Sequence, residues 1–561
     1  MQVLRGRGKL LLPFQHHHHR VFFKKHLVPL GVYVAPVGHK CHLRRVGARG
    51  IGLRRIGQSS CRRPPDTQHG KLIGLDGGWN TQHRVFTGLT SKISLCTNTA
   101  EGASLPQIAF SPMRISVKNI LLALLATATA TLAQPRPTPR QLNWQQLETT
   151  AFLHFTVNTF TDKEWGDGTE SPAVFNPTKL DARQWIRSLK EAGFKMAILT
   201  AKHHDGFCLW PTRTTEHSVK NSPWKNGKGD VVRDVADACR EYGLKFGVYL
   251  SPWDRHESLY GTPAYNNFYK SQLRELLTNY GPLAEVWFDG AKGENAKDMV
   301  YDFAGYWALV RQLQPNAVMF SDAGPDVRWV GNEAGNAGET CWSTINTDGL
   351  APGKADATYL NRGDANGKSW VPAETDVSIR PGWFYHPAED SKVRTPKNLV
   401  NLYYQSVGRN SLLLLNVPPN RDGLFSDADV ASLKAFRRIL NETFKTNLVA
   451  AAPRLTDKKL GTFVSVKPDQ PLVVKLNGEA EFDRISIQEN IANGQHVIDG
   501  KVEYWNGTDW TALSAFTTVG YKRLLRFPAV KASQVRITIT NAKGPVELAE
   551  VGVFKASAEE E

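Results

Sequence analysis

Between residues 145 and 450, short apolar runs alternate with stretches of helical periodicity. The apolar runs are nearly continuous, which is typical of strands buried on both faces of a parallel sheet. They predict strands over 152–155, 194–200, 244–250, 285–289, 317–321 and 411–416. The stretches between them predict helices over 181–192, 231–242 and 268–280. Repeated units of this kind predict a (β/α)8-like barrel over residues 145–450.

After about residue 455 the pattern changes to a period of two. Apolar and polar residues alternate over 482–487, 501–505 and 535–539, as they do in half-buried strands. Asn506-Gly507 lies between two alternating stretches and is a hairpin turn signal. The sequence therefore predicts a C-terminal antiparallel β-sandwich over residues 455–557.

Positive charge is concentrated at the start of the chain. The 561-residue sequence has a formal net charge of +16, but residues 1–112 hold seventeen Lys and Arg against three acids. The rest of the chain is therefore close to neutral. A nucleic-acid-binding arm is the alternative for residues 1–112. Because no aromatic-basic platform accompanies the charge, we expect a spurious or disordered extension and no nucleic-acid partner.

Residues 113–133 have the three parts of a secretory signal peptide. A short basic region is followed by an apolar run over 120–133 that is too short to span a bilayer well, and small residues precede Gln134. A buried core helix is the alternative, but three prolines between 135 and 139 favour an exposed linker over 134–144. We therefore expect an exported protein, periplasmic or extracellular, without a membrane partner after cleavage.

Cysteine and glycine patterns give no sign of a cofactor. Cys208, Cys239 and Cys341 are too widely spaced for a disulfide framework or a zinc pattern, so we expect them to pack in the core. No Gly-rich phosphate-binding turn follows the first predicted strand, which argues against dinucleotide binding.

Two carboxyl groups stand out in the second half of the predicted barrel. Glu-Val-Trp-Phe-Asp-Gly at 285–290 predicts a buried strand that ends at Asp289. Trp-Val-Gly-Asn-Glu-Ala-Gly at 329–335 places Glu333 in a Gly- and Asn-rich loop. Two carboxyl groups that converge above a barrel are what glycoside hydrolysis requires. Polar and aromatic residues also cluster past the other strand ends, on the face where barrel active sites lie and in a mixture that suits sugars.

Four motifs carry a family resemblance: Leu-His-Phe-Thr-Val-Asn-Thr-Phe (153–160), Glu-Trp-Gly-Asp-Gly (164–168), Lys-His-His-Asp-Gly-Phe (202–207) and Trp-Phe-Asp-Gly (287–290). In these motifs the chain resembles the α-L-fucosidases of glycoside hydrolase family 29. The resemblance covers residues 140–450 and, more loosely, the sandwich. It implies an exo-acting, retaining enzyme that releases α-linked L-fucose from oligosaccharides or glycoconjugates, with Asp289 as the nucleophile.

The same resemblance implies which residues contact the fucose ring: His154, Glu164, Trp165, His203, His204, Tyr249 and Trp287. Trp383, in Arg-Pro-Gly-Trp-Phe, resembles a further element near the sugar. Trp-Val-Gly-Asn-Glu resembles the branch of the family that is selective for α-1,3/1,4-linked fucose, in which its Glu is the acid/base. Glu333 is therefore the first choice for this role, and Glu374 is the runner-up.

Plainer interpretations remain open. Asp289 alone could be a turn cap, Glu333 a solvated loop acid, and Trp383 a packing residue. Adjacent residues of a strand point to opposite faces, so we expect His203 and His204 to bind sugar hydroxyls rather than one metal ion. No metal site is expected. The alternative function is a non-catalytic carbohydrate-binding protein on the same fold.

Overall fold

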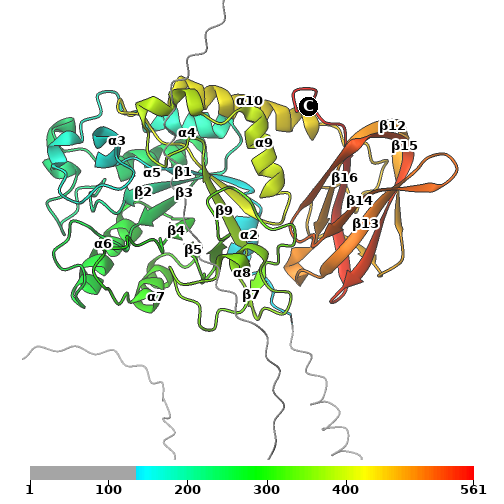
Figure 1. The fold of residues 1–561 in the computed structure, drawn as a ribbon, viewed down its shortest axis with the longest axis horizontal. Helices are drawn as coiled ribbons and strands as arrows, with labels where there is room; N and C mark the ends of the chain where they lie inside the picture. The colour runs from blue at the N-terminus through cyan, green and yellow to red at the C-terminus, as the bar shows by residue number, and fades with distance from the viewer. Residues whose placement is uncertain (1–133, 561) are drawn as a thin grey trace, which may run out of the picture. The chain divides into compact units, whose positions relative to one another are not determined.

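The structure is a computed structural model and describes residues 134–560 (Figure 1). The predicted N-terminal extension (1–112) and signal peptide (113–133) lie outside the described residues. Within residues 134–560, no helix combines the length and the apolarity that crossing a bilayer requires.

Eight parallel strands close into a barrel, in agreement with the predicted fold class. Going around the barrel, the order is β1-β10-β9-β6-β5-β4-β3-β2. Because all eight strands run in the same direction, their carboxyl ends and the loops that follow them share one face. The strands are β1 (Thr149–Leu153), β2 (Met196–Lys202), β3 (Lys245–Leu250), β4 (Glu285–Trp287), β5 (Val318–Ser321), β6 (Val327–Trp329), β9 (Ala373–Ser378) and β10 (Leu412–Asn416).

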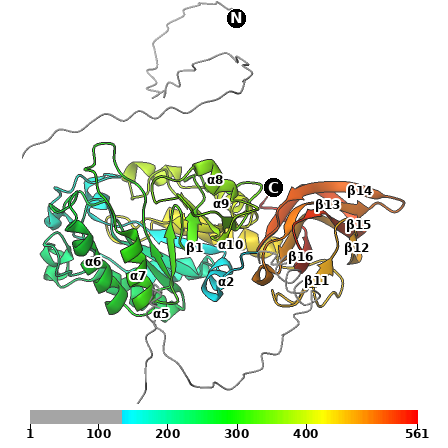
Figure 2. The same cartoon turned by 90° about the horizontal axis from the view of Figure 1, so that it is seen from below.

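Helices surround the barrel, as both ribbon views show (Figures 1 and 2). The predicted helix 231–242 is confirmed as α5, with Asp230 as its N-cap and Gly243 in the left-handed conformation as its C-cap. The outer helices are α3 (Val157–Thr161), α4 (Ala182–Glu191), α5 (Val231–Tyr242), α6 (Tyr265–Asn279), α7 (Phe303–Leu313), α8 (Ala357–Arg362), α9 (Pro396–Gln405) and α10 (Asp427–Thr443).

The segment 134–144 is not simply the linker that its prolines suggested. Pro139 opens helix α2 (Pro139–Gln145), where its missing N–H costs nothing, and Thr138 with Gln141 forms a capping box. Trp144 is buried and its indole donates a 2.7 Å hydrogen bond to Glu285 Oε2 of strand β4. Helix α2 is therefore anchored in the barrel interior.

The C-terminal region is antiparallel, as predicted, and its strands form one continuous six-stranded sheet in the order β11-β16-β12-β15-β13-β14. Bulges interrupt the pairing of the two longest strands, β12 and β15, which lets the sheet curve around its own apolar core. The predicted hairpin at Asn506-Gly507 joins β13 to β14. The strands are β11 (Val464–Val466), β12 (Leu472–Glu489), β13 (Val497–Trp505), β14 (Trp510–Thr517), β15 (Arg523–Ala542) and β16 (Val546–Phe554).

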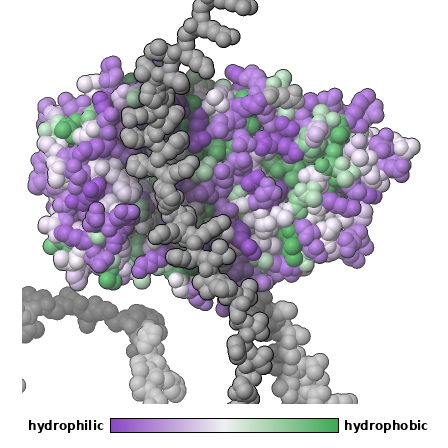
Figure 3. All heavy atoms as spheres, in the orientation of Figure 1, coloured by the Kyte–Doolittle hydropathy of each residue, from purple (hydrophilic) through white to green (hydrophobic). Residues whose placement is uncertain are grey.

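A small two-stranded sheet, β7 (Thr344–Ile345) with β8 (Ser369–Trp370), lies in the long connection between β6 and β9. The face of the molecule drawn in Figure 3 is mostly hydrophilic, with a hydrophobic patch over the C-terminal sheet. Cys208, Cys239 and Cys341 are buried and free, which confirms the core role expected for them.

Candidate active site

Asp289 lies two residues past the end of β4, which is shorter than the predicted strand 285–289, and so stands at the carboxyl end of this strand. Its carboxylate is fixed by two hydrogen bonds: the Tyr249 hydroxyl donates to Oδ2 at 2.8 Å and the Ala291 backbone N–H donates to Oδ1 at 2.7 Å. The side chain keeps 19% of its surface exposed. A carboxylate held in one orientation but open to solvent is suited to attack a bound molecule.

His204 lies beside this carboxylate, with Nε2 3.6 Å from Asp289 Oδ2. The Ser251 hydroxyl donates to the Trp253 carbonyl at 2.5 Å, so Ser251 Oγ accepts from His204 Nδ1–H at 2.7 Å. This leaves Nε2 as the acceptor of the ring. Burial lowers the pKa of His204 to about 4 despite the nearby negative charge of Asp289. The ring is therefore neutral at pH 7 and can accept a hydrogen bond from a hydroxyl group.

His154 is held in the same tautomer by a different partner. The Asn416 amide donates to Ser378 Oγ and to the Trp383 carbonyl, so its Oδ1 accepts from His154 Nδ1–H at 2.8 Å. Burial lowers the pKa of His154 to about 3. A second neutral imidazole thus presents its Nε2 as an acceptor.

The argument that His203 and His204 point to opposite faces is wrong, because both residues lie just past the last residue of β2, where the alternation of a strand no longer applies. Their ring centroids are 4.1 Å apart, and His203 also stacks on Tyr249 at 5.8 Å. Both rings therefore belong to the same site. Within residues 134–560, no group of three or more His, Cys, Asp or Glu residues is arranged to hold a metal ion.

Aromatic rings form the floor and one wall of the site. Trp287 stacks on Phe320 with centroids 4.0 Å apart and contacts Tyr249 at 5.3 Å. Trp383 contacts His154 at 5.2 Å. An apolar floor with imidazole and carboxylate groups around it matches the two faces of a sugar ring.

Glu164 holds the loop that carries Trp383. Its carboxylate accepts the backbone N–H groups of Trp383 and Phe384 at 2.9 and 3.2 Å, and it lies 2.7 Å from His386 Nε2. Gly382 packs so closely on Glu164 that an added Cβ would lie 2.2 Å from its carboxylate. Glu164 therefore supports the wall of the site, in addition to any contact with a ligand.

Glu333 lies in the loop after β6 and accepts a 3.3 Å hydrogen bond from the Trp383 indole. Its side chain is exposed, but neighbouring groups partly desolvate the carboxyl group and raise its pKa. The negative charges of Asp289 and Glu164 raise the pKa of Glu333 further. The structure thus places Glu333 close enough to Asp289 and Glu164 to be repelled by both, on the same face of the barrel.

Glu374, the runner-up, lies elsewhere. It is the second residue of β9, toward the opposite end of the barrel, and is fully buried. Oε1 accepts a 2.8 Å hydrogen bond from the Trp287 indole, and the carboxyl group of Glu285 is a close electrostatic neighbour. Burial and the neighbouring carboxyl group raise the pKa of Glu374 well above its usual range. Glu374 supports Trp287 from below and has no access to the mouth of the barrel.

Trp165 is 47% exposed and meets His204 and Trp253 edge-on at 5.5 and 5.3 Å. Together with Trp253 it borders a hollow of about 300 Å³ beside the histidines. The hollow is lined by Trp165, Asp167, Trp253, Asp254, Arg255, Glu257, Tyr260, Gly293, Glu294, Asn295, Ala296 and Lys297.

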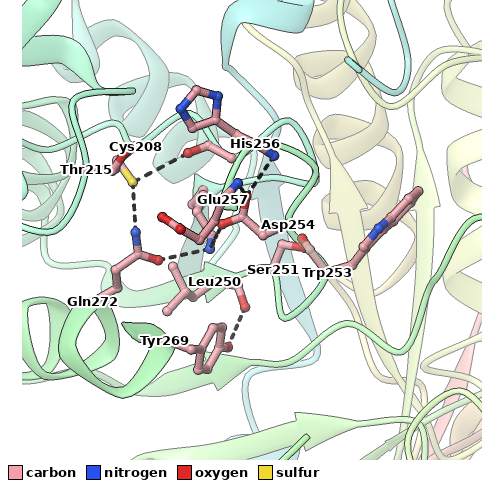
Figure 4. Close-up of polar contacts among 12 residues, drawn as sticks. Cys208, Thr215, Leu250, Ser251, Trp253, Asp254, His256, Glu257, Tyr269 and Gln272 are labelled. Carbon is pink, nitrogen blue, oxygen red and sulfur yellow. Dashed lines mark hydrogen bonds and ion pairs between the residues drawn. The ribbon is translucent and has the colours of Figure 1, made fainter. Parts of the chain in front are cut away.

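A buried ion pair makes one wall of this hollow rigid. Asp254 accepts from Lys202 Nζ at 2.7 Å and from the backbone N–H groups of His256 and Glu257 at 3.0 and 2.9 Å (Figure 4). Lys202 also donates to Gln272 at 2.9 Å. These contacts fix the loop after β3, and with it the position of Trp253.

Several supporting residues were not predicted, among them Ser251, Asn416 and His386. Asn416 could have been noticed as the single polar residue that ends the apolar strand Leu412–Asn416. Ser251 likewise follows directly after β3. His386 carries no such signal, because its role depends on a loop that comes from another part of the chain.

Comparison with known proteins identifies relatives of this chain. The family described as alpha-L-fucosidase matches residues 138–443. Alpha-L-fucosidase 1 of Arabidopsis thaliana is 45% identical over 444 residues, which cover 75% of this chain and 87% of that protein.

Solved structures of glycoside hydrolases are also similar to this chain. A glycoside hydrolase 29 family member from an unknown rumen bacterium is 44% identical, with a TM-score of 0.70 over 76% of this chain and 78% of that one. A Ruminococcus gnavus GH29 fucosidase in complex with fucose is 35% identical, with a TM-score of 0.70 over 76% of this chain and 96% of that one.

Proposed function

The chain belongs to the alpha-L-fucosidase family, and from this premise we propose that it hydrolyses α-linked L-fucose with retention of configuration. Alpha-L-fucosidases are glycoside hydrolases, and two carboxyl groups are the chemistry such a reaction needs. Asp289 is the nucleophile and Glu333 is the acid/base in this proposal.

The reaction proceeds in two steps. Glu333, protonated at rest, donates its proton to the glycosidic oxygen while Asp289 attacks the anomeric carbon, so that the C–O bond to the leaving group breaks and a fucosyl-enzyme ester forms. The carboxylate of Glu333 then removes a proton from water. The resulting hydroxide attacks the same carbon from the opposite side and releases L-fucose and free Asp289.

One observation carries this assignment: the two carboxyl groups differ in environment as their roles require. Asp289 accepts two hydrogen bonds that hold its carboxylate in one orientation toward the opening of the site. Glu333 receives one long hydrogen bond and is repelled by Asp289 and Glu164, which favours its protonated form. The neutral histidines 154 and 204 would accept hydrogen bonds from sugar hydroxyls around the reacting carbon.

Two measurements test the proposal. The first product released from an aryl α-L-fucoside, followed by proton NMR before mutarotation, should be the α-anomer; an initial β-anomer would show inversion. The Asp289→Ala variant should fold normally and lose turnover. If this variant hydrolyses the aryl fucoside at the wild-type rate, the assignment of the nucleophile is wrong.

We further propose a preference for α-1,3/1,4-linked fucose on branched glycans. A fucose on such a branch has a neighbouring sugar, and the hollow beside Trp165 offers indole faces, carboxylates and an amide to a second ring. An α-1,3/1,4-linked trisaccharide should therefore be hydrolysed with a higher kcat/KM than an α-1,2-linked one.

The contribution of the hollow can be separated from fucose hydrolysis itself. Asn295 and Lys297 line the hollow on an exposed loop. Asn295→Ala and Lys297→Ala should raise KM several-fold for the branched trisaccharide and leave hydrolysis of an aryl fucoside unchanged. Equal kinetics of variants and wild type on the trisaccharide would contradict the proposed preference but not the fucosidase activity.

Export is also proposed, on the basis of the predicted signal peptide over 113–133. N-terminal sequencing of the protein secreted by its native host should give a start near Gln134. A mature protein that retains the basic residues of 1–112 would contradict this.

A further inference from the structure

A second hollow lies between the barrel and the C-terminal sheet, away from the candidate active site. It measures about 230 Å³ and is formed by the end of α9, the loop around Glu339, strand β14 and the start of β15. Its lining is largely polar and includes three arginines: Arg409, Arg523 and Arg526. We call it the arginine pocket.

The positive charge of the arginine pocket is not balanced. Arg409 pairs with Glu339 at 2.8 Å, a carboxylate whose side chain is 81% exposed. Arg523 and Arg526 have no ion pair with a carboxylate among the residues that the structure describes: Arg523 donates to the carbonyl oxygens of Glu339 and Thr518, and Arg526 donates to the Asn401 amide at 2.7 Å. Three guanidinium groups thus share one carboxylate.

The effect of the unbalanced positive charge is clearest at Arg523. It is only 5% exposed, and within residues 134–560 its Nη1 makes no hydrogen bond, whereas Nε and Nη2 are both engaged. Burial, with the nearby charge of Arg409, lowers the pKa of Arg523 to about 10. A buried cation with a spare donor and like-charged neighbours is stabilised by any anion that reaches it.

We propose that the arginine pocket binds a compact oxyanion, a sulfate or phosphate group. Guanidinium forks match the oxygens of such groups in geometry as well as in charge, and form charge-assisted hydrogen bonds with them. Leu524, Leu525 and the ring of Tyr404 line the same pocket and would limit the access of water to the bound group.

The same chemistry can come from two sources: a free inorganic ion, or an ester group on a glycan. The loop of Glu339 joins the pocket to the segment that bears Glu333, since Arg409 also donates to the Ala337 carbonyl at 2.9 Å. An anion here would therefore stabilise both the junction of barrel and sheet and the base of the Glu333 loop.

A purely structural role is the competing interpretation, in which the arginines only fasten the barrel to the sheet through neutral acceptors. The two interpretations differ in the effect of Arg526→Glu. Under the proposal, the new carboxylate repels an anion, so that the saturable response to sulfate seen in wild type disappears in the variant. Under the structural interpretation, losing the Arg526 contacts lowers stability and no response to sulfate exists.

The experiment measures Tm and calorimetric affinity for sodium sulfate at constant ionic strength, in the low-millimolar range where general salt effects are small. Wild type should show a saturable rise in Tm. Arg526→Gln, at an exposed position, should bind sulfate about tenfold more weakly, as expected for the loss of a charge-assisted hydrogen bond. Arg454→Gln removes the same charge from an exposed position outside the pocket and should behave as wild type.

Absence of saturable sulfate binding in wild type, or equal binding by wild type and Arg526→Gln, would overturn the proposal. So would a saturable sulfate response that persists in Arg526→Glu. A comparison of inorganic sulfate, galactose 6-sulfate and galactose then separates the sources. Tighter binding of the sulfated sugar than of the free ion indicates a glycan ester, and binding of the ion alone indicates an inorganic ligand.

Discussion

At the scale of the residue, glutamine substitution distinguishes the two candidate proton donors, Glu333 and Glu374. Glu333→Gln keeps the shape of the side chain and its contact with Trp383 but removes the transferable proton. We expect kcat to fall by about 10²–10⁴-fold on a natural oligosaccharide, the usual contribution of a general acid. The loss should be smaller on an aryl fucoside with a good leaving group, because that bond breaks with little protonation. Glu191→Gln, on the outer helix α4 and away from the site, is the matched control and should be unchanged on both substrates.

The pH profile gives an independent prediction for Glu333. Desolvation, Asp289 and Glu164 raise its pKa, and the acid must be protonated to act. The rate should therefore decline as pH rises through this raised pKa, and Glu333→Gln should lack that alkaline limb. His154 and His204, with pKa values of about 3 and 4, are already neutral in the alkaline part of the profile and cannot produce the alkaline limb.

His386 is the control for this profile. Burial lowers its pKa, but hydrogen bonds to Asp162 and Glu164 outweigh this effect and raise the pKa above its usual value, so the His386 imidazole is the other group in the wall whose proton loss could shape the alkaline limb. A His386→Gln variant that loses the alkaline limb would move the assignment from Glu333 to the imidazole.

Glu374 and Glu285 give a prediction about stability. The structure pairs the two carboxyl groups inside the barrel and gives each an indole donor, Trp287 and Trp144. Burial raises the pKa of Glu285 to about 8, so the native state holds a proton that the unfolded chain releases above about pH 4.5. Stability should therefore fall as pH rises from about 4.5 to about 8.

Glutamine substitution tests this pair without disrupting its packing. Glu374→Gln imitates the protonated acid, so we expect activity within a few-fold of wild type and a flatter decline of stability with pH. Glu374→Leu leaves the Trp287 indole unpaired and should cost about 1–3 kcal/mol of stability. Chemical denaturation at several pH values measures both effects. A loss of kcat in Glu374→Gln as large as in Glu333→Gln would make Glu374 the acid/base instead.

At the scale of the element, the loop after β9 is a unit that Glu164 holds in place through the backbone of Trp383 and Phe384. Glu164→Ala and Trp383→Ala should each raise KM, and their effects should be non-additive because removing either group disorders the same wall. A double-mutant cycle on an aryl fucoside measures this coupling. Additive effects would mean that Glu164 acts on the substrate independently of the loop.

The helices and strands that could be predicted from the sequence share a property: all side chains on one face of such an element lie in the same kind of environment, either buried or exposed to solvent. α5 was predicted residue for residue because Gly243 and a continuous apolar stripe agree, and the structure adds Asp230 as the N-cap. β6 and β9 were missed because their buried positions hold Arg328, Glu374 and Asp376, which pair with partners far away in sequence. No pattern along the chain reveals that such charges are satisfied.

The same limit applies to the candidate site. Residues at strand tips, such as Asp289, could be predicted because barrel topology sends every tip to one face. The depth of Glu374 in the barrel could not be predicted from the sequence, because it depends on where β9 begins and on the register of β9 with β10. The close approach of the His203 and His204 rings to each other could not be predicted either, because it depends on β2 ending at Lys202.

At the scale of the whole molecule, Glu148 joins the barrel to the C-terminal sheet. Just before β1, it accepts hydrogen bonds from Tyr403 of α9 at 2.8 Å and from Tyr521 at 2.9 Å, and it forms an ion pair with Lys522. Burial acts to raise its pKa, but Lys522 and the hydroxyl donors prevail and lower it to about 2. The carboxylate therefore contributes stability that is complete above the unfolded pKa of about 4.5 and is lost as pH falls toward about 2.

Glu148→Gln should accordingly lower stability at pH 7 by about 1.5–3 kcal/mol, the range for hydrogen bonds to a charged group. The difference from wild type should shrink as pH falls from about 4.5 toward about 2, because the wild-type carboxylate then becomes protonated. Glu191→Gln breaks an ion pair with Lys434 in which both side chains are about half exposed, and should cost less than about 1 kcal/mol. Denaturant unfolding, followed separately by near-UV and far-UV signals, tests whether the barrel and the sheet still unfold together. Equal losses in the two variants, or a Glu148→Gln deficit that persists at low pH, would mean that the junction depends on apolar packing and not on this buried charge.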